Sequence, residues 1–373
     1  MNKIKIQKLL DSPLFNLSLS SRELFHSNFL YWLANLYPEE FGTVFIKFCK
    51  VKPTNSKISE IYREKNNIDL SFKYENGQEV IIENKVKSIP DRGQLERYSK
   101  KSSLNQNCIL LSLSKPVFFN GRKTSIICDK KWYYVSYLDL IKLLKIMNNK
   151  ISDNYHKNIL LDYIEFIDGL IHVDKLCKLR KTDLYTLYSK ELDKVYKLLF
   201  TIRLHDFYLK KKYQQLSQLV YEKLSNNLKE QIAFDTILNW NDKNDILITF
   251  GMTRGQGLVD IKYKIKNKLA FGIQIQGEQY RLILEDENGK LVKEFKDYYL
   301  KNRLWFVFDK QLDGRVYPLS GGFNSFNNSK KEKTFVYKSI KISPTITIDT
   351  LVNIIYKDVK RIIKVRKNLY DTI

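Results

Sequence analysis

Asp69, Glu83 and Lys85 are the side chains in this sequence whose types and spacing could catalyse a reaction. Glu83 and Lys85 lie two positions apart in the apolar run VIIENKVKS, so they share one face if that run is a strand. Asp69 lies in an earlier strand-like run, NIDLSFKYENG, which ends in the Asn-Gly pair typical of a hairpin turn. We therefore expect Asp69 to approach Glu83 across two paired strands.

The chemistry expected of this group is hydrolysis of phosphodiesters. Two carboxylates on neighbouring strands can hold a hard divalent cation such as Mg²⁺ through oxygen ligands. A lysine beside them can stabilise the negative charge that develops on a phosphate. The alternative is an ion pair between Glu83 and Lys85 on an exposed edge strand. The apolar residues on both sides of the pair favour the catalytic interpretation.

The elements around this hairpin predict an α/β layer with the hairpin at its centre. Apolar residues recur at helical spacing from about Ser20 to Pro38, and a second helical stretch follows at 40–49. Further helices are predicted at 91–101 and 157–173. Strands are predicted at 107–114 and at the start of KWYYVSYLDLIKLLKIM, which continues as a helix.

The second part of the chain has a different order of elements. The stretch from 174 to about 230 is predicted to be almost entirely helical, because Leu and Tyr recur at three- and four-residue intervals. Strands are then expected in DILITFG, LVDIKYKI, LAFGIQIQ and LWFVFD, with a loop at 317–333 and a last helix at 349–369. We predict two domains, residues 1–173 and a basic α+β domain at 174–373.

The charge favours a polyanionic partner, meaning nucleic acid or an acidic membrane surface. The formal net charge is +23, with 26 basic and 18 acidic residues up to Val173 and 38 basic and 23 acidic residues beyond it. A lysine-rich genome would give the same excess. Lys210, Lys211 and Lys212, within DFYLKKKYQQL, are candidate nucleic-acid contacts, as are Lys330 and Lys331 in the loop.

The composition excludes several classes of protein. Hydrophobic residues make up 43% of the chain, which excludes a disordered protein. The four cysteines form no CxxC pair, so reduced thiols are expected and a zinc site is not. The sequence has no signal-peptide core and no apolar run of the ~20 residues that span a bilayer. We expect a cytoplasmic protein that does not enter a membrane.

Asp69, with Glu83-Asn84-Lys85 on the next strand, resembles the PD-(D/E)XK nuclease superfamily, with Ile68 in place of the motif's proline, a departure that many members share. ELFHSNFLYWL resembles the first helix of an uncharacterised bacterial branch of this superfamily. The IIENK strand and Gln-Leu-Glu-Arg-Tyr helix of that branch match residues 81–85 and 94–98. The resemblance covers about residues 15–170 and implies a restriction-endonuclease-like core, a central mixed sheet flanked by helices.

The resemblance also implies roles for individual residues. Asp69, Glu83 and Lys85 are the implied catalytic residues, and Mg²⁺ or Mn²⁺ is the implied cofactor. The implied metal ligands are Asp69, Glu83, the backbone carbonyl of Asn84, and Glu23. Glu23 could instead be a first-turn acid that stabilises a helix dipole.

Three further residues have implied supporting roles. His26 could contact a phosphate or the metal shell, or be a packed or capping histidine. Gln94 and Tyr98, on one face of a helix, could steady Lys85 or the substrate, or pack the helix against the sheet.

The function expected is a metal-dependent nuclease, with DNA ahead of RNA as substrate and bacterial restriction or antiphage defence as the setting. The alternative is a catalytically inactive nuclease fold that binds nucleic acid or regulates a partner. A homo-oligomer or a defence-system partner is left open. Asp260, Gln274 and Gln276 repeat the offsets of the first site, but glutamines are poor Mg²⁺ ligands, so coincidence is favoured over a degenerate second core.

Overall fold

The structure of the chain is a computed structural model. It describes residues 2–21, 23–49, 55–101, 106–119, 121–234, 245–266, 269–286, 305–317, 323–328 and 333–370. The chain folds into two compact units. The first comprises Met1–Cys177 and Ile202–Phe207, and the second comprises Lys178–Thr201 and Tyr208–Ile373.

The first unit contains a mixed six-stranded sheet in the order β1-β2-β3-β4-β6-β5. Its strands are β1 (Ile58–Lys65), β2 (Ile68–Tyr74), β3 (Glu79–Lys85), β4 (Gln106–Ser112), β5 (Thr124–Ile127) and β6 (Lys130–Ser136). The first three strands form an antiparallel meander, and β3, β4 and β6 run parallel to one another. Gly77, with φ of +84°, makes the turn between β2 and β3, a backbone conformation that favours glycine.

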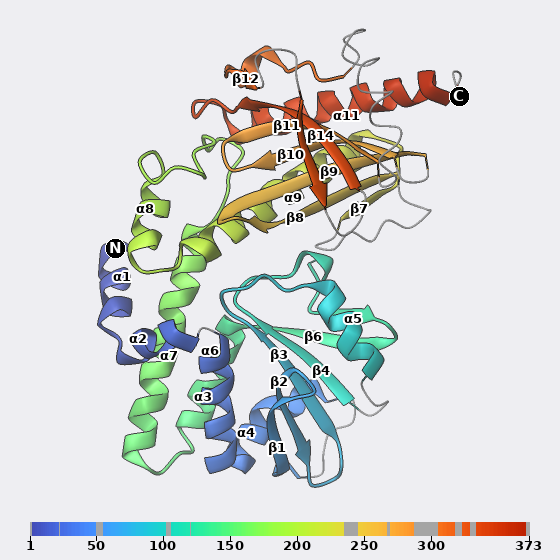
Figure 1. Cartoon of the computed structure of the whole chain (residues 1–373). Helices are drawn as coiled ribbons and strands as arrows, with labels where there is room; N and C mark the ends of the chain where they lie inside the picture. The colour runs from blue at the N-terminus through green and yellow to red at the C-terminus, as the bar shows by residue number, and fades with distance from the viewer. Residues whose placement is uncertain are drawn as a thin grey trace. The chain divides into compact units, whose positions relative to one another are not determined.

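Helices cover both faces of this sheet (Figure 1). They are α1 (Asn2–Asp11), α2 (Pro13–Ser21), α3 (Glu23–Leu36), α4 (Pro38–Phe45), α5 (Arg92–Lys101), α6 (Tyr137–Asn148) and α7 (Asn154–Leu176). Side chains alternate along β3, so Ile81, Glu83 and Lys85 face α5. Asn84 faces α3 and α6 on the other side, where it contacts Ser27 and Tyr137.

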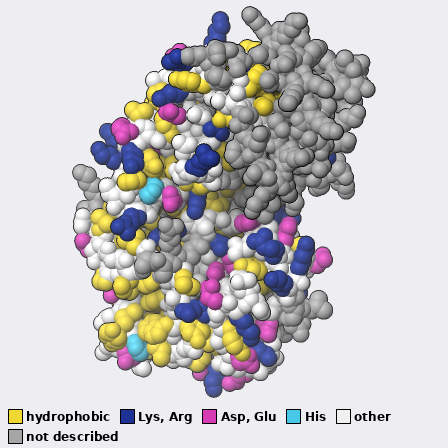
Figure 2. Space-filling model, in the orientation of Figure 1, with side chains coloured by type: hydrophobic (Ala, Val, Ile, Leu, Met, Phe, Trp, Pro, Cys, Tyr) yellow, Lys and Arg dark blue, Asp and Glu magenta, His cyan; other side chains and the backbone are white. Residues whose placement is uncertain are grey.

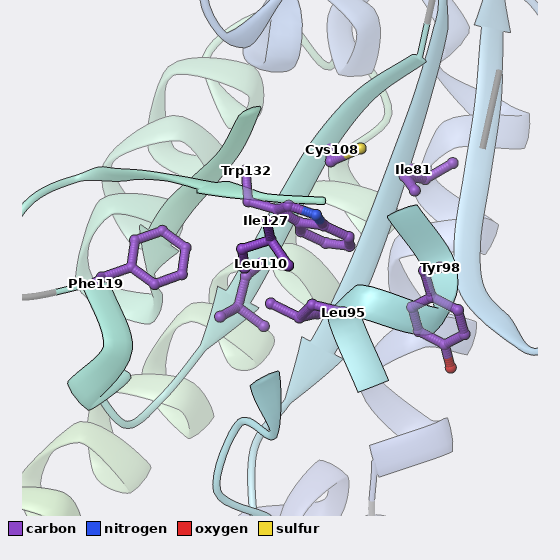
Figure 3. Packing of buried hydrophobic residues seen from close by; sticks show 8 residues of the cluster. All are labelled: Ile81, Leu95, Tyr98, Cys108, Leu110, Phe119, Ile127 and Trp132. Carbon is purple, nitrogen blue, oxygen red and sulfur yellow. The ribbon is translucent and has the colours of Figure 1, made fainter. Parts of the chain in front are cut away.

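The helix α5 is held on the sheet by a buried hydrophobic cluster (Figure 3). Leu95 and Tyr98 supply the helix side of this cluster, and Trp132 donates a hydrogen bond from Nε1 to Ser99 Oγ at 2.9 Å. The sheet side includes Ile81 and Leu110. This packing fixes α5 over the same face of β3 that carries Glu83 and Lys85.

The second unit contains a largely antiparallel sheet in the order β12-β14-β11-β10-β9-β8-β7, with β13 paired to β14. Its strands are β7 (Ile232–Phe234), β8 (Ile246–Thr253), β9 (Gln256–Lys266), β10 (Leu269–Gln276), β11 (Gln279–Asp286), β12 (Val316–Tyr317), β13 (Asn324–Asn328) and β14 (Lys333–Lys341). Its helices are α8 (Lys194–Thr201), α11 (Ile348–Tyr370) and nearly all of α9 (His205–Asn227). The helix α11 packs against β9 and β10 (Figure 1).

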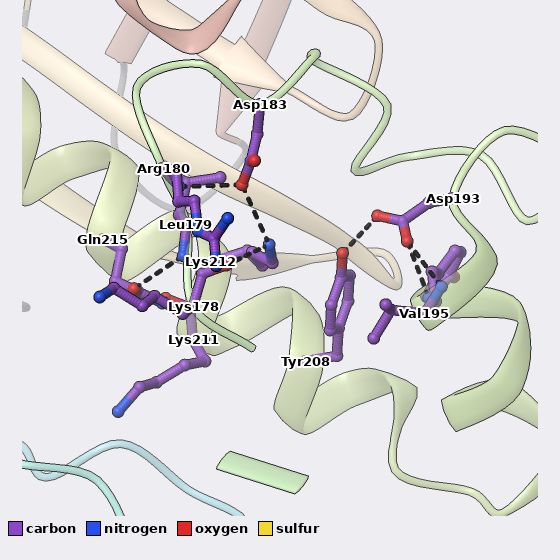
Figure 4. Close-up of polar contacts among 11 residues, drawn as sticks. Lys178, Leu179, Arg180, Asp183, Asp193, Val195, Tyr208, Lys211, Lys212 and Gln215 are labelled. Carbon is purple, nitrogen blue, oxygen red and sulfur yellow. Dashed lines mark hydrogen bonds and ion pairs between the residues drawn. The ribbon is translucent and has the colours of Figure 1, made fainter. Parts of the chain in front are cut away.

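The predicted α/β fold with a central mixed sheet flanked by helices is confirmed. The prediction of an almost continuous helix from 174 was wrong for the stretch between α7 and α8, which forms turns. Hydrogen bonds to side-chain carboxylates stabilise those turns. Asp183 accepts from the Arg180 N–H at 2.9 Å, and Asp193 accepts from the N–H groups of Val195 and Tyr196 at the start of α8 (Figure 4).

The strand predicted in LWFVFD was also wrong, because Trp305–Asp309 is not in a strand. Trp305 is buried and donates from Nε1 to the Ile283 carbonyl at 3.1 Å, and Phe306 has φ of +63°, outside the β region. The aromatic side chains of this segment therefore pack against the unit, and its backbone does not pair with a neighbouring strand. The part of the predicted loop at 324–328 is the strand β13, and 318–322 and 329–332 lie outside the described residues.

Candidate active site

The strands β2 and β3 bring Asp69 and Glu83 together. Leu70 pairs with Ile82 in the antiparallel register, so the next position along the same register sets Asp69 opposite Glu83. The backbone N–H of Asn84 donates to Asp69 Oδ2 at 2.7 Å. Where the β2–β3 pairing ends, the Asp69 carboxylate thus accepts the hydrogen bond that a backbone carbonyl of β2 would otherwise accept.

Glu83 and Lys85 form a short ion pair on the α5 face of β3. Lys85 Nζ lies 2.6 Å from Glu83 Oε1, and the Glu83 side chain is 1% exposed while that of Lys85 is 12% exposed. Burying a carboxylate is costly unless a cation and hydrogen-bond donors compensate its charge. The pair is therefore a buried charge cluster and not the exposed edge-strand ion pair that was the alternative.

Gln94 and Tyr98 adjoin this cluster from α5. Gln94 Nε2 donates to Glu83 Oε1 at 2.7 Å and lies 2.8 Å from the Tyr98 hydroxyl oxygen. The Tyr98 hydroxyl donates to the Asn67 carbonyl at 2.6 Å, just before β2. Burial is the main cause that raises the pKa of Tyr98, so its hydroxyl keeps its proton. The two helix residues therefore link Glu83 to the strand that carries Asp69.

His26 lies on the opposite face of the sheet, among aromatic rings. The side chain is 0% exposed, its Nδ1 lies 3.0 Å from the Tyr163 hydroxyl, and its ring stacks on Phe166 with centroids 5.2 Å apart. Burial, and secondly the charge of Lys87, lowers the pKa of His26 to about 3, so the ring is neutral. The described contacts of His26 are those of a packed histidine.

The donor set of the site suits a hard divalent cation. Asp69 and Glu83 offer carboxylate oxygens, and such cations complete their coordination with backbone carbonyls, water and substrate oxygens. Within the described residues no three His, Cys, Asp or Glu side chains form a group that could hold a metal. Glu23 begins α3, but its side chain lies outside the described part of the structure.

The consecutive residues Lys210, Lys211 and Lys212 of α9 do not share one environment. Lys212 is buried, donates from Nζ to the Lys178 carbonyl at 2.7 Å and lies 3.9 Å from Asp183 Oδ2. Lys210 and Lys211 are half-buried. On the face of the molecule seen in Figure 2, Lys and Arg side chains are interspersed with Asp and Glu. Lys330 and Lys331 lie outside the described residues.

A second buried charge cluster lies on β9 and β11. Lys262 Nζ is 3.4 Å from Asp260 Oδ2 and 2.5 Å from Glu285 Oε2. Gln274 pairs with Asp260 in the β9–β10 register, and its Oε1 accepts from Arg281 at 2.7 Å. Asp260 and Gln274 were singled out from their offsets in the sequence, whereas Lys262 and Glu285 were not. Lys262, two residues after Asp260, could have been found from the strand period.

Residues 14–145 match the family model of the PD-(D/E)XK nuclease superfamily, which confirms the resemblance found in the sequence. The matched region holds Asp69, Glu83, Lys85, Gln94 and Tyr98. No curated protein and no solved structure matches the chain. Within the described residues, no helix combines the length and the apolar character needed to cross a membrane.

Proposed function

We propose that this protein is a metal-dependent nuclease whose catalytic residues are Asp69, Glu83 and Lys85. The observation that supports the proposal best is the buried Glu83, which contacts Lys85 at 2.6 Å and Gln94 at 2.7 Å, on the strand next to Asp69. The place of this pair where the β2–β3 ladder ends, beside the half-buried Asp69, favours a functional origin.

Each residue of the site would have a distinct task. Asp69 and Glu83 would hold Mg²⁺ or Mn²⁺, with the backbone carbonyl of Asn84 as a further oxygen donor. The bound cation would supply Lewis-acid stabilisation of the phosphate. Lys85 would stabilise the negative charge that grows on the phosphate oxygens as the phosphorus–oxygen bond breaks. Gln94 would keep the Glu83 carboxylate in one orientation.

The substrate proposed is nucleic acid, with DNA ahead of RNA, and the setting proposed is bacterial restriction or antiphage defence. The basic excess of the second unit supports a role for that unit in binding the substrate. Among Lys210, Lys211 and Lys212, the first two are the candidates for phosphate contacts, because the ammonium of Lys212 donates to a backbone carbonyl. The four cysteines are all free thiols, which supports the cytoplasm as the compartment.

The test is incubation of the full chain with supercoiled DNA, linear DNA, single-stranded DNA and RNA. Each substrate is tested with Mg²⁺, Mn²⁺, Ca²⁺ or EDTA. We expect cleavage with Mg²⁺ or Mn²⁺, poor turnover with Ca²⁺, which is larger and less demanding in its geometry, and none with EDTA. Binding without cleavage under every condition would instead support a catalytically inactive nuclease fold.

A further inference from the structure

Asn84 is a buried polar residue on the face of β3 that points away from Glu83 and Lys85. It is 1% exposed, and its Oδ1 accepts a hydrogen bond from the Tyr137 hydroxyl at 2.6 Å. Its Nδ2 lies 3.4 Å from Ser27 Oγ. Tyr137 begins α6 and Ser27 belongs to α3, so two helices hold this one amide.

The remaining residues on this face of the strand are apolar. Val80, Ile82 and Val86 point the same way as Asn84 and are buried. A buried amide costs desolvation energy that another apolar side chain would avoid, so its presence calls for a physical reason. Its position supplies one, because the N–H that donates to Asp69 Oδ2 at 2.7 Å belongs to Asn84 itself.

The peptide unit that precedes Asn84 lies between the parts of the site. Its N–H holds the Asp69 carboxylate, and the residues on either side of Asn84 carry the ion pair of Glu83 and Lys85. A satisfied buried amide has one preferred orientation, since turning it would leave its polar atoms without partners. Rotation of this peptide would turn its N–H away from the Asp69 carboxylate.

We propose that Asn84 and Tyr137 are positioning residues of the nuclease site. The Tyr137 hydroxyl holds the Asn84 side chain, and the Asn84 side chain keeps its own N–H on the Asp69 carboxylate. Neither side chain contacts the reacting atoms. The effect on the cleavage rate rests on the proposed function, whereas the effect on the Asn84 N–H does not.

The test compares Tyr137→Phe with Tyr74→Phe. Tyr74 is also a fully buried tyrosine of the first unit, and its hydroxyl donates to the Gly42 carbonyl at 2.8 Å. Both variants lose one buried hydroxyl that has a second side-chain partner, Tyr163 for Tyr137 and Cys49 for Tyr74, so their effects on stability should be similar. Only Tyr137→Phe alters the support of Asn84.

The measurement is amide hydrogen exchange of the ¹⁵N-labelled full chain without metal, with Ile82 on the same strand as the reference amide. In Tyr137→Phe we expect exchange at Asn84 to accelerate about tenfold or more relative to Ile82. In Tyr74→Phe any acceleration should be the same for both amides. The kcat of Tyr137→Phe should fall about tenfold with little change in KM, and that of Tyr74→Phe should hold.

An unchanged ratio of Asn84 to Ile82 exchange in Tyr137→Phe would overturn the proposal, and so would an equal change in Tyr74→Phe. If Tyr137→Phe does not fold, Asn84→Leu replaces it, because leucine fits an apolar site and removes only the anchored amide. Altered Asn84 exchange in a protein that never cleaves nucleic acid would contradict the proposed function and leave the positioning role intact.

Discussion

The two units each place an aspartate opposite a polar residue on an antiparallel neighbour, with a lysine two residues from one of them. In the first unit the residues are Asp69, Glu83 and Lys85, where the register ends at Leu70 and Ile82. In the second unit Asp260 faces Gln274 in the middle of a ladder that continues on both sides, and Lys262 follows on the same strand.

The two clusters differ in the backbone pairing around the aspartate. Where the ladder ends, Asp69 accepts a hydrogen bond from a backbone N–H and stays half-buried. Where the ladder continues, Asp260 is sealed in the sheet and is balanced by Lys262, which also contacts Glu285. Ligand sites of α/β sheets favour the carboxyl ends of strands, and Lys85 is the last residue of β3. We therefore propose a catalytic role for the first cluster and a structural role for the second.

The largest expected effect on stability is in the second cluster. Lys262→Met should lower the free energy of unfolding by about 3–5 kcal/mol, because two buried carboxylates lose the cation they share. Glu83→Gln should change it by about 1 kcal/mol or less, because the amide oxygen can still accept from Lys85 and Gln94, Lys85 is partly exposed, and the repulsion from Asp69 is removed. Urea unfolding of the full chain checks both variants. A small loss in Lys262→Met would show that the second cluster is not structural.

Acid should act in opposite directions on the two units. His26 has a folded pKa of about 3, so the unfolded chain binds its proton more readily and stability falls as pH drops below 6.5, by about 2 kcal/mol at pH 5. Asp358 has a folded pKa raised to about 6 by burial, so the folded state gains about 1 kcal/mol between pH 7 and pH 5.

Two variants separate these contributions. His26→Phe should flatten the loss of stability between pH 7 and pH 5, and Asp358→Asn should remove the gain. The measurement is the free energy of unfolding of each full-length variant as a function of pH. A wild-type slope retained in both variants would mean that other groups carry the pH dependence.

Gln94→Leu should reduce kcat about tenfold with KM little changed, because Glu83 loses the donor that orients it while substrate contacts remain. The matched control is Gln274→Leu, which removes the corresponding glutamine of the second cluster and its bond with Arg281. Steady-state cleavage of one DNA substrate compares the two. Equal losses in both variants would mean that the Gln94 effect is general and not specific to the first cluster.

The smallest effect concerns nucleic-acid affinity. Replacing Lys210 and Lys211 with Gln should reduce the slope of log affinity against log salt by about 1–2, as expected for the loss of one or two phosphate contacts. Lys142 and Lys145, exposed on α6 in the first unit, are the charge-matched control pair. Binding is measured for the full chain without metal. An equal decrease of the salt slope in the two double variants would mean that Lys210 and Lys211 make no specific phosphate contact.

The sequence was sufficient to predict the hairpin, the shared face of Glu83 and Lys85, and the helix that carries Gln94 and Tyr98. These features depend on residues within about thirty positions and on simple strand and helix periods. The ion pair of Lys262 and Glu285 could not be predicted, because it depends on how β9, β10 and β11 pair. The burial of Lys212 depends on the distant Lys178 carbonyl, and a run of three lysines predicts exposure for all of them.

The most direct test of the central claim is single-turnover cleavage of DNA by the wild type, Glu83→Gln and Asp260→Asn, each with Mg²⁺ and with EDTA. If Glu83 is a metal ligand, Glu83→Gln should cleave at least about a thousandfold more slowly than the wild type. Asp260→Asn should cleave at the wild-type rate, and EDTA should stop cleavage by both the wild type and Asp260→Asn. Undiminished cleavage by pure Glu83→Gln, or wild-type activity that persists in EDTA, would contradict the central claim.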